Sequence, residues 1–282
     1  MKKIILLLIL IFTTPFFAED DPPPPPQKTW IPSGIAGLNL SQLALENWTQ
    51  GGEDALAFTL YTAFGLDYFD GPWAFTNKLK LSYGRTKLGS DDFRTTDNEL
   101  FLENLLTHDV GWFANPYISN AVRTVITKGY DYSGDEAVQI ADFFDPGYLN
   151  QAIGLAYKAS EIFTTRLGVG FQETFTNTYT KYSDDPDTPN EIEDFKFDTG
   201  IESVSNLNIK FDDDLLYTSE LRLFGTFDQI DVWDVRWDNI VTAQVTKLVN
   251  VNLNILLIYD VDQTAKTQLK EALQIGITYN LF

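Results

Sequence analysis

Residues 54–69, DALAFTLYTAFGLDYF, decide the fold class because two kinds of side chain alternate along them without a break. The larger, mostly apolar row is Leu56, Phe58, Leu60, Thr62, Phe64, Leu66 and Tyr68, and the other row is Ala57, Thr59, Tyr61, Ala63, Gly65 and Asp67. A period of two residues places these rows on opposite faces of a β-strand. Such a strand is long for the sheet of a soluble domain, in which strands usually run about five or six residues.

The same alternation returns along the rest of the chain, and clusters of Gly, Asp, Asn and Pro separate the repeats. Twelve segments are expected to form strands: residues 37–48, 54–69, 72–86, 94–107, 113–129, 148–158, 162–176, 195–211, 215–227, 232–246, 249–260 and 267–282. Twelve is even, as in single-chain bacterial barrels, and segments of ten or more residues can cross a bilayer as tilted strands. We therefore predict an all-β fold, a transmembrane antiparallel β-barrel of about twelve strands.

Aromatic residues near the segment ends favour a membrane barrel over a soluble β-sandwich, which also alternates but buries most of its Trp residues in mid-strand. Amphipathic rings at strand ends are typical of the two girdles that flank a membrane. The predicted girdle contains Trp73, Trp112, Trp233 and Trp237, with Trp48, Tyr68, Tyr83 and Tyr130 near other boundaries. The turn at 70–72 and those near 158–161, 212–214 and 248 are short, whereas 177–194 is long and acidic, and short turns are typical of the periplasmic side.

The N-terminal residues predict export. Lys2 and Lys3 precede the apolar run 4–12, which is too short to span a bilayer, and we expect cleavage after Ala18. The prolines of 22–26 predict an extended polyproline II spacer. The expected organisation is a signal peptide at 1–18, a Pro-rich spacer at 19–36 and the barrel at 37–282.

Composition narrows the chemistry. The chain has no Cys and one His, His108, so it offers no thiolate nucleophile, no disulfide framework and no multi-histidine metal site. Its formal net charge of -20 disfavours nucleic acid as a partner. We expect no cofactor, no metal and no catalytic residues, and therefore a protein that is not an enzyme.

Charged side chains inside the predicted strands should face the interior of the barrel, because ionised groups are costly in lipid. Lys78 and Lys80 precede Glu99 and Glu103 on the next strand, where opposite charges are expected to meet across a hairpin ladder. The candidate residues lining the lumen are Lys78, Lys80, Glu99, Glu103, Arg166, Glu202, Glu220, Arg222, Asp234, Arg236 and Asp238. This mixed lining predicts either a wet passage or a plug of salt-bridged side chains. A barrel of about eight strands can be filled by side chains and one of about sixteen leaves a channel, so a strand number of twelve does not decide between the two.

Two further patterns resemble known ones. The last segment carries apolar residues up to Tyr279 and ends at Phe282, which resembles the C-terminal signal read by the barrel-insertion machinery, although Phe282 falls one residue out of step. Residues 37–42, together with Asn47, Trp48, Gly51 and Gly52, resemble the opening of an uncharacterised domain-of-unknown-function family (DUF3078-like) of Bacteroidetes-type outer-membrane β-barrel proteins. Residues 143–147 are a second similar patch. The resemblance implies a location and a fold over most of the mature chain, and no reaction.

The sequence predicts a non-enzymatic protein of the Gram-negative outer membrane: a passive, porin-like channel, a transporter or a surface scaffold. Its expected partners are the lipid bilayer, the insertion machinery and small polar solutes. Two alternatives stay open at this point. One is a barrel phospholipase or esterase that uses His108 as base, and the other is a soluble periplasmic β-sandwich that binds a ligand.

Overall fold

The computed structural model describes residues 28–47, 52–134, 136–185, 188 and 190–282. Within these residues twelve strands build one barrel: β1 (Thr29–Leu43), β2 (Ala55–Asp70), β3 (Trp73–Leu88), β4 (Arg94–His108), β5 (Asn115–Thr124), β8 (Gly147–Lys158), β9 (Phe163–Phe175), β10 (Phe195–Lys210), β11 (Leu215–Thr226), β12 (Asp234–Gln244), β13 (Val249–Asp260) and β14 (Thr264–Asn280). A hairpin of β6 (Gly129–Asp131) and β7 (Val138–Ala141) and the 3-10 helix η1 (Thr180–Tyr182) lie in loops.

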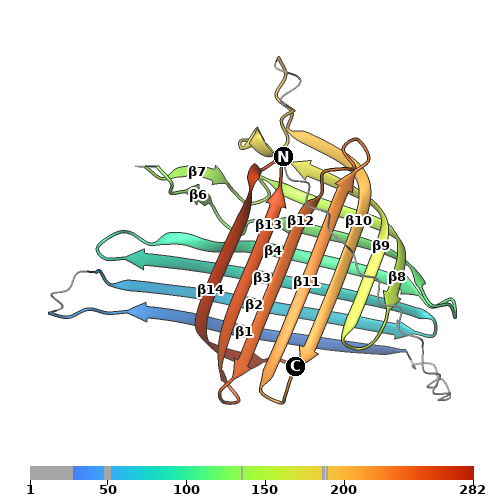
Figure 1. Ribbon diagram of the computed structural model, residues 1–282, viewed down its shortest axis with the longest axis horizontal. Helices are drawn as coiled ribbons and strands as arrows, with labels where there is room; N and C mark the ends of the chain where they lie inside the picture. The colour runs from blue at the N-terminus through green and yellow to red at the C-terminus, as the bar shows by residue number, and fades with distance from the viewer. Residues whose placement is uncertain (1–27, 48–51, 135, 186–187, 189) are drawn as a thin grey trace, which may run out of the picture.

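Every barrel strand pairs antiparallel with its two neighbours, and the pairing of β1 with β14 closes the sheet. In Figure 1 the strands β10 to β14 of the front wall run at a large angle to the strands β1 to β4 behind them. Such a crossing is expected because strands in a closed barrel are tilted against the barrel axis. The predicted all-β, twelve-stranded antiparallel barrel is confirmed, and the β-sandwich alternative is wrong, because the apolar rows are not enclosed between two stacked sheets.

The predicted segments agree with the strands to within three residues except at both ends of β1 and at the C-terminal end of β5. Strand β1 begins at Thr29 rather than at 37, so it takes in part of the segment predicted as a spacer. Pro32 and Gly34 hide this part of the strand from the alternation pattern. A proline is tolerated there because β1 pairs with β14 only from Ile35 onward. The predicted signal peptide and the proline run at 22–26 lie outside the described residues.

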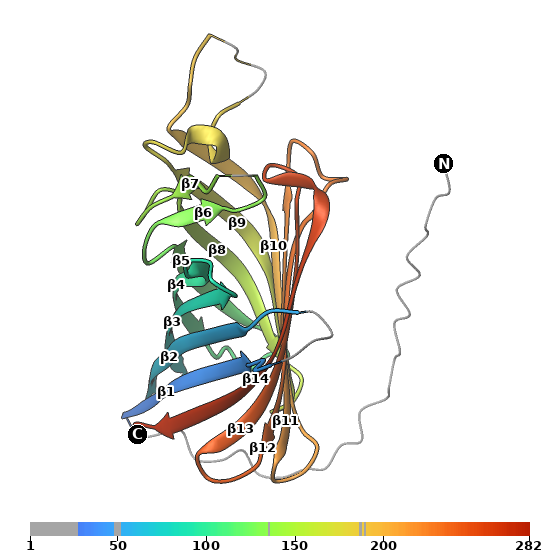
Figure 2. The same ribbon diagram turned by 90° about the vertical axis from the view of Figure 1, so that its left-hand side faces the viewer.

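The two rims of the barrel differ. The connections at one end, here called the turn rim, are short: 71–72, 109–114, 159–162, 211–214 and 245–248. The other end, the loop rim, carries the connections 44–54, 89–93, 125–146, 176–194, 227–233 and 261–263. Figure 2 shows β6, β7 and η1 beyond the barrel wall at the loop rim. The short turns predicted near 70–72, 158–161, 212–214 and 248 all lie at the turn rim, as expected for a chain that winds up and down an even number of times.

The outer face of the barrel is apolar and exposed. On β14, Leu269 and Leu273 are each 66% exposed and Ile275 is 61% exposed. Similar outward residues occur around the wall: Leu56, Leu60, Leu66, Leu106, Ile118, Ile153, Leu155, Leu167, Val169 and Ile277. An apolar surface of this extent is unstable in water and suits contact with lipid or with another protein.

One polar row interrupts this outer face. Asn77, Asn104, Asn120 and Gln151 follow one another in register across β3, β4, β5 and β8. The Nδ2 atom of Asn77 donates to Oδ1 of Asn104 at 2.6 Å, so part of this row is satisfied within the wall. An amide pair that bonds to itself costs less on an apolar face than a single unbonded amide.

Aromatic rings gather near both rims of the outer face. At the turn rim the ring centroids of Trp30 and Tyr68 are 4.4 Å apart, and those of Trp73 and His108 are 4.1 Å apart. Trp112 stands in the turn after β4, against Phe113. Near the loop rim the ring pairs are Phe171 with Phe197 and Phe175 with Phe195.

The other two tryptophans predicted for the girdle lie on the outer face near the loop rim. Trp233 precedes β12 near the loop rim, and its ring covers the backbone of Gly225. Trp237 is the fourth residue of β12, and its Nε1 donates to Oγ of Ser219 at 2.9 Å. The predicted girdle position of Trp48 lies outside the described residues.

Candidate functional site

The barrel interior holds the ionised groups. Glu103 on β4 lies inside the barrel, and the strand register places every second residue from it, and their partners on neighbouring strands, on the same inner face. All the candidate lumen residues occupy such inward positions: Lys78, Lys80, Glu99, Glu103, Arg166, Glu202, Glu220, Arg222, Asp234, Arg236 and Asp238. The interior is therefore polar and mixed in sign.

Two ion pairs join strands that lie directly opposite each other across the lumen. Nζ of Lys78 on β3 lies 3.0 Å from Oε2 of Glu220 on β11, and Nη2 of Arg236 on β12 lies 3.2 Å from Oε1 of Glu99 on β4. The strands of each pair are six apart in either direction around the barrel, so they face each other across it. Side chains that meet from opposite walls narrow the lumen at this level.

A buried network joins further strands across the interior. Glu103 accepts from Nη2 of Arg166 and, at 2.8 Å, from Nη2 of Arg222, which reaches it from five strands away. Nε of Arg222 in turn lies 2.7 Å from Oε1 of Glu220. Charge-assisted bonds of this kind compensate the cost of removing each ion from water only when every partner is present. We call the residues that join the walls in this way the central cluster: Lys78, Glu99, Glu103, Arg166, Glu220, Arg222 and Arg236.

The expected pairing of charges along one hairpin ladder is found in the strand register but not as an ion pair. Lys78 stands opposite Glu103 in the register of β3 and β4, yet its ammonium pairs with Glu220 on the far wall. Two arginines already occupy Glu103, which leaves Lys78 to the next carboxylate within reach. Lys80 stands opposite Phe101, with its ammonium 5.9 Å from the ring centroid.

Arg123 and Phe101 also face the lumen, although the sequence patterns did not predict them. Arg123 on β5 forms an ion pair with Glu99, and its guanidinium lies 4.5 Å from the ring centroid of Phe101. Arg222 approaches the same ring at 4.9 Å, so Phe101 lies between two guanidinium groups. The alternation of Tyr117, Ser119, Ala121 and Arg123 was the signal that could have identified this inward row.

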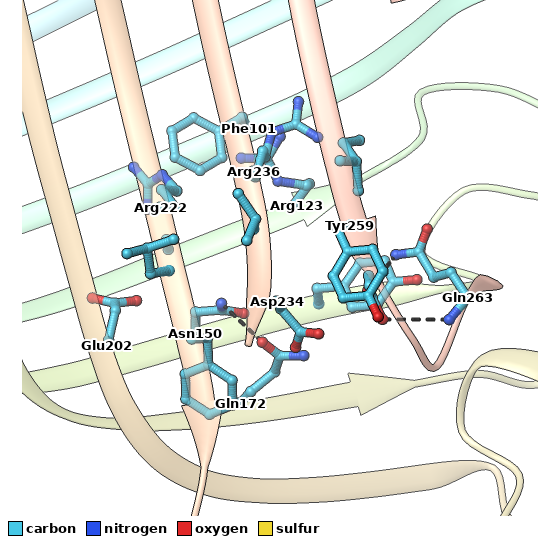
Figure 3. Close-up of a pocket in the computed structure, with 17 residues that line it drawn as sticks. Phe101, Arg123, Asn150, Gln172, Glu202, Arg222, Asp234, Arg236, Tyr259 and Gln263 are labelled. Carbon is cyan, nitrogen blue, oxygen red and sulfur yellow. Dashed lines mark hydrogen bonds between the residues drawn. The ribbon is translucent and has the colours of Figure 1, made fainter. Parts of the chain in front are cut away.

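A cavity of about 140 Å³ lies on the loop-rim side of the central cluster (Figure 3). Arg123, Arg222 and Arg236 line one end of it, together with Phe101. Asp234, Asp260 and Gln263 line the part closer to the loop rim, and Asn150 and Gln172 lie between. Nδ2 of Asn150 donates to Oε1 of Gln172 at 3.3 Å. The cavity therefore has a basic end and an acidic end.

A smaller pocket continues from this cavity toward the loops, because both are lined by Tyr148, Gln172, Asp260 and Gln263. Tyr182 of η1, Lys196 and Asp262 line its other side. Lys196 pairs with Asp262 and, at 3.2 Å, with Asp198. These residues form an acidic mouth with one lysine.

A different network fills the interior where β1, β13 and β14 meet. Nδ2 of Asn252 donates to Oδ1 of Asn39 at 3.2 Å and to Oδ1 of Asn250 at 2.7 Å, and Nδ2 of Asn39 donates to Oε1 of Gln274 at 3.2 Å. Gly276 lies among these amides, where a Cβ atom would come within 2.3 Å of Oδ1 of Asn250. The network needs glycine at this position and leaves no open space beside it.

His108 does not face the interior. It ends β4 on the outer face, where its ring packs against Trp73. Its Nδ1 is buried, and within the described residues it has no hydrogen-bond partner. The structure thus brings no serine hydroxyl to this histidine among the residues that it describes. A group of three or more His, Cys, Asp or Glu side chains placed to hold a metal ion is also absent from the described residues.

The residues of the family-like motif lie in the loop after β1. Asn47 adopts a φ of 54° and Gly52 a φ of 111°, so both take the turn conformations that Asn and Gly tolerate best. Trp48 and Gly51 lie outside the described residues. In the second patch Phe144 has a φ of 57°, and its ring lies so close to Gly147 that a Cβ there would sit 2.6 Å away. The described motif residues shape loops.

The C-terminus explains the step in the alternation pattern. Strand β14 ends at Asn280, with Tyr279 outward and 62% exposed. The backbone N–H of Leu281 donates to the carbonyl of Gly34 at 2.8 Å, and the ring of Phe282 lies against Gly34. Phe282 can therefore reach the outer face although it falls out of step, because it lies beyond the last regular strand residue.

Part of the chain matches one known protein family. Residues 40–130 match the model of a family described as "Protein of unknown function (DUF3078)". The predicted resemblance is confirmed over this segment, from the end of β1 to the start of β6, and the second patch at 143–147 lies outside it. The Bacteroidetes setting of the family stays a prediction. No curated protein matches the chain.

Several solved barrels are similar in outline. The translocator domain of the autotransporter NalP from Neisseria meningitidis is 10% identical, with a TM-score of 0.37, over 89% of this chain and 87% of that one. The COG4313 outer membrane channel from Pseudomonas putida F1 is 11% identical, with a TM-score of 0.39, over 93% and 99% of the two chains. The outer membrane channel DcaP of Acinetobacter baumannii is 8% identical, with a TM-score of 0.34, over 90% and 98%. Similarity this low carries no information on function, and the fold rests on the strand pairing.

Proposed function

We propose that this protein is a non-enzymatic barrel of the Gram-negative outer membrane whose lumen is closed at the central cluster in its resting state. It would act as a surface scaffold or ligand-binding barrel rather than as an open pore. The observation that carries this proposal is the pair of ion pairs between opposite walls, Lys78 with Glu220 and Arg236 with Glu99.

The outer face supports the membrane location. Its exposed leucines, isoleucines and valines would be costly in water at about 25 cal/mol per Å² of apolar surface, and lipid removes that cost. Each strand of the closed sheet pairs with two neighbours, and β1 and β14 join from Ile35 to Leu40, so the backbone hydrogen bonds that β-structure in a bilayer requires are made between strands. Aromatic rings near both rims suit the two lipid interfaces.

The difference between the rims supports an orientation. Single-chain outer-membrane barrels keep short turns in the periplasm and longer loops outside. The turn rim of this protein would then face the periplasm, and the cavity would open toward the cell exterior. Export through residues 1–18 and recognition of Tyr279 and Phe282 by the insertion machinery remain part of this proposal.

Conductance in planar bilayers tests the closure. We expect the refolded wild-type protein to give no resolved conductance steps in potassium chloride. A double variant, Glu99→Ala with Glu220→Ala, removes the acidic partner of both spanning pairs and should give measurable steps. Asp213→Asn, in an exposed turn at the turn rim, is the matched control and should stay silent. Large, steady steps from the wild-type protein would refute the closed lumen.

The hydrolase alternative has its own test. If His108 were a catalytic base, purified protein would hydrolyse phospholipid, and His108→Ala would abolish that turnover. We expect no turnover above background from either protein, because the described part of the chain places no hydroxyl nucleophile at this histidine.

A further inference from the structure

The cavity on the loop-rim side of the central cluster is lined by arginines and by aspartates, and the aspartates are not needed to close the lumen. Its volume of about 140 Å³ is close to the roughly 150 Å³ of an engineered protein cavity that binds one molecule of benzene. A solute of amino-acid size would fill it. The inference below rests on the proposed function in one respect only, namely that the lumen is closed beneath the cavity.

The basic end of the cavity carries more positive charge than its partners neutralise. Arg123 and Arg236 both pair with the single carboxylate of Glu99, and neither has another ion pair within the part of the chain that is described. Two guanidinium groups offer ten N–H donors, of which one carboxylate can accept only a few. Glu202 also lines the cavity, but its carboxylate pairs with Arg166, at 3.9 Å, and not with these two arginines. The remaining N–H donors of Arg123 and Arg236 suit the carboxylate of a ligand.

The other end of the cavity carries an unpaired acid. Asp234 lines the cavity and, among the described residues, has neither an ion pair nor a side-chain hydrogen bond (Figure 3). Asp260 beside it is held by Gln263, whose Nε2 donates to Oδ2 at 2.8 Å. An enclosed carboxylate without a partner is costly, and an ammonium group of a ligand would supply that partner.

The mouth restricts which solutes can enter. A simple anion would have to pass Asp198, Asp260 and Asp262, which Lys196 only partly neutralises. A simple cation would pass the mouth and then meet the arginines at the basic end. Only a solute with charges of both signs is favoured along the whole path.

We propose that this cavity binds a small zwitterion, a solute with one carboxylate and one ammonium group, which enters from the loop rim. Arg123 and Arg236 hold its carboxylate, and Asp234 holds its ammonium group. The closed central cluster beneath the cavity forms the floor of the site.

Calorimetric titration of the refolded, full-length protein tests this proposal with four probes: glycine, diglycine, acetate and methylammonium. At least one of the two zwitterions should bind about tenfold or more tightly than either singly charged probe, since each added charge-assisted contact is worth about a factor of ten. Asp234→Asn should remove this preference, so that the zwitterion binds no better than acetate. Arg236→Gln should weaken both zwitterion and acetate.

Asp213→Asn, far from the cavity at the turn rim, should leave all four affinities unchanged. A folded barrel, judged by its strand spectrum in circular dichroism, that binds neither zwitterion would overturn the proposal. So would a zwitterion preference that persists in Asp234→Asn. Conductance separates this result from the proposed function: a wild-type protein that conducts refutes the closed lumen, while the titration of the same preparation still decides the binding site.

Discussion

At the scale of the residue, Glu103 shows how much the interior depends on single charges. The residue is only 9% exposed, and its carboxylate accepts from two arginines on different strands. Each guanidinium has lost most of its water, so each relies on this carboxylate for compensation. Removal of one charge therefore affects three residues.

We predict that Glu103→Gln lowers the free energy of unfolding by about 3–5 kcal/mol, the usual cost of removing one partner from a buried ion pair. Arg166 and Arg222 would then lie in the interior with an uncompensated charge. Urea titration in lipid vesicles measures this change. Asp213→Asn, which removes an exposed partner of Lys210, is the control and should leave the midpoint nearly unchanged. An equal, small effect of both variants would show that water fills the central cluster.

At the scale of the element, Asp145 ties two long loops together at the loop rim. It lies next to β8, and its carboxylate accepts from the backbone N–H groups of Asn177 at 2.9 Å, Thr178 at 2.8 Å and Tyr179 at 3.3 Å. These donors open the connection 176–194, which follows β9. One side chain thus positions the start of the loop that carries η1, and through Tyr182 it influences the mouth of the cavity.

We predict that Asp145→Ala frees this loop and speeds tryptic cleavage after Lys181 by about tenfold, which corresponds to a loss of about 1.4 kcal/mol in the free energy of local opening. Mass spectrometry of digests of the protein in vesicles measures the rate. Asp109→Ala is the matched control, because Asp109 accepts from the backbone N–H of Gly111 within the connection 109–114 at the turn rim, at the other end of the barrel from 176–194. Equal rates in the two variants would mean that Asp145 does not hold the loop.

At the scale of the whole molecule, the barrel is inverted relative to a soluble protein: its apolar residues face outward and its ions face inward. Neighbouring positions of one strand therefore meet different surroundings. On β14, Leu273 faces outward, whereas Ala272 pairs with the inward Asn254.

We predict that Leu273→Arg lowers the free energy of unfolding in lipid vesicles by about 2–4 kcal/mol, as for an arginine on the lipid face near the middle of a bilayer. Ala272→Arg, one residue away, places the same charge in the polar interior and should cost clearly less. Urea titration of both variants measures the difference. In a soluble protein the order would be reversed, because an exposed surface position tolerates arginine, so the reversed order would refute the membrane location.

The sequence by itself determined the number of strands, most of their bounds and the face to which each residue belongs. The period of two is a local property, and Leu56 or Lys78 can be assigned to a face from its near neighbours alone. The same local rule failed at β1, because Pro32 and Gly34 break the pattern while pairing with β2 preserves the strand. Arg123 also belongs to an alternating row of inward residues, but it was not predicted to face the lumen.

Only the tertiary structure decided which charges meet. Strand order places β3 opposite β11 and β4 opposite β12, so Glu220, the partner of Lys78, and Arg236, one of the two partners of Glu99, lie more than a hundred residues away in the chain. Alternation predicts that a side chain points inward, but closure of the barrel decides which side chain of the opposite wall it meets. For the same physical reason the closed lumen, the cavity above it and the unpaired Asp234 were invisible in the sequence: each depends on the distance between opposite walls, which no local pattern contains.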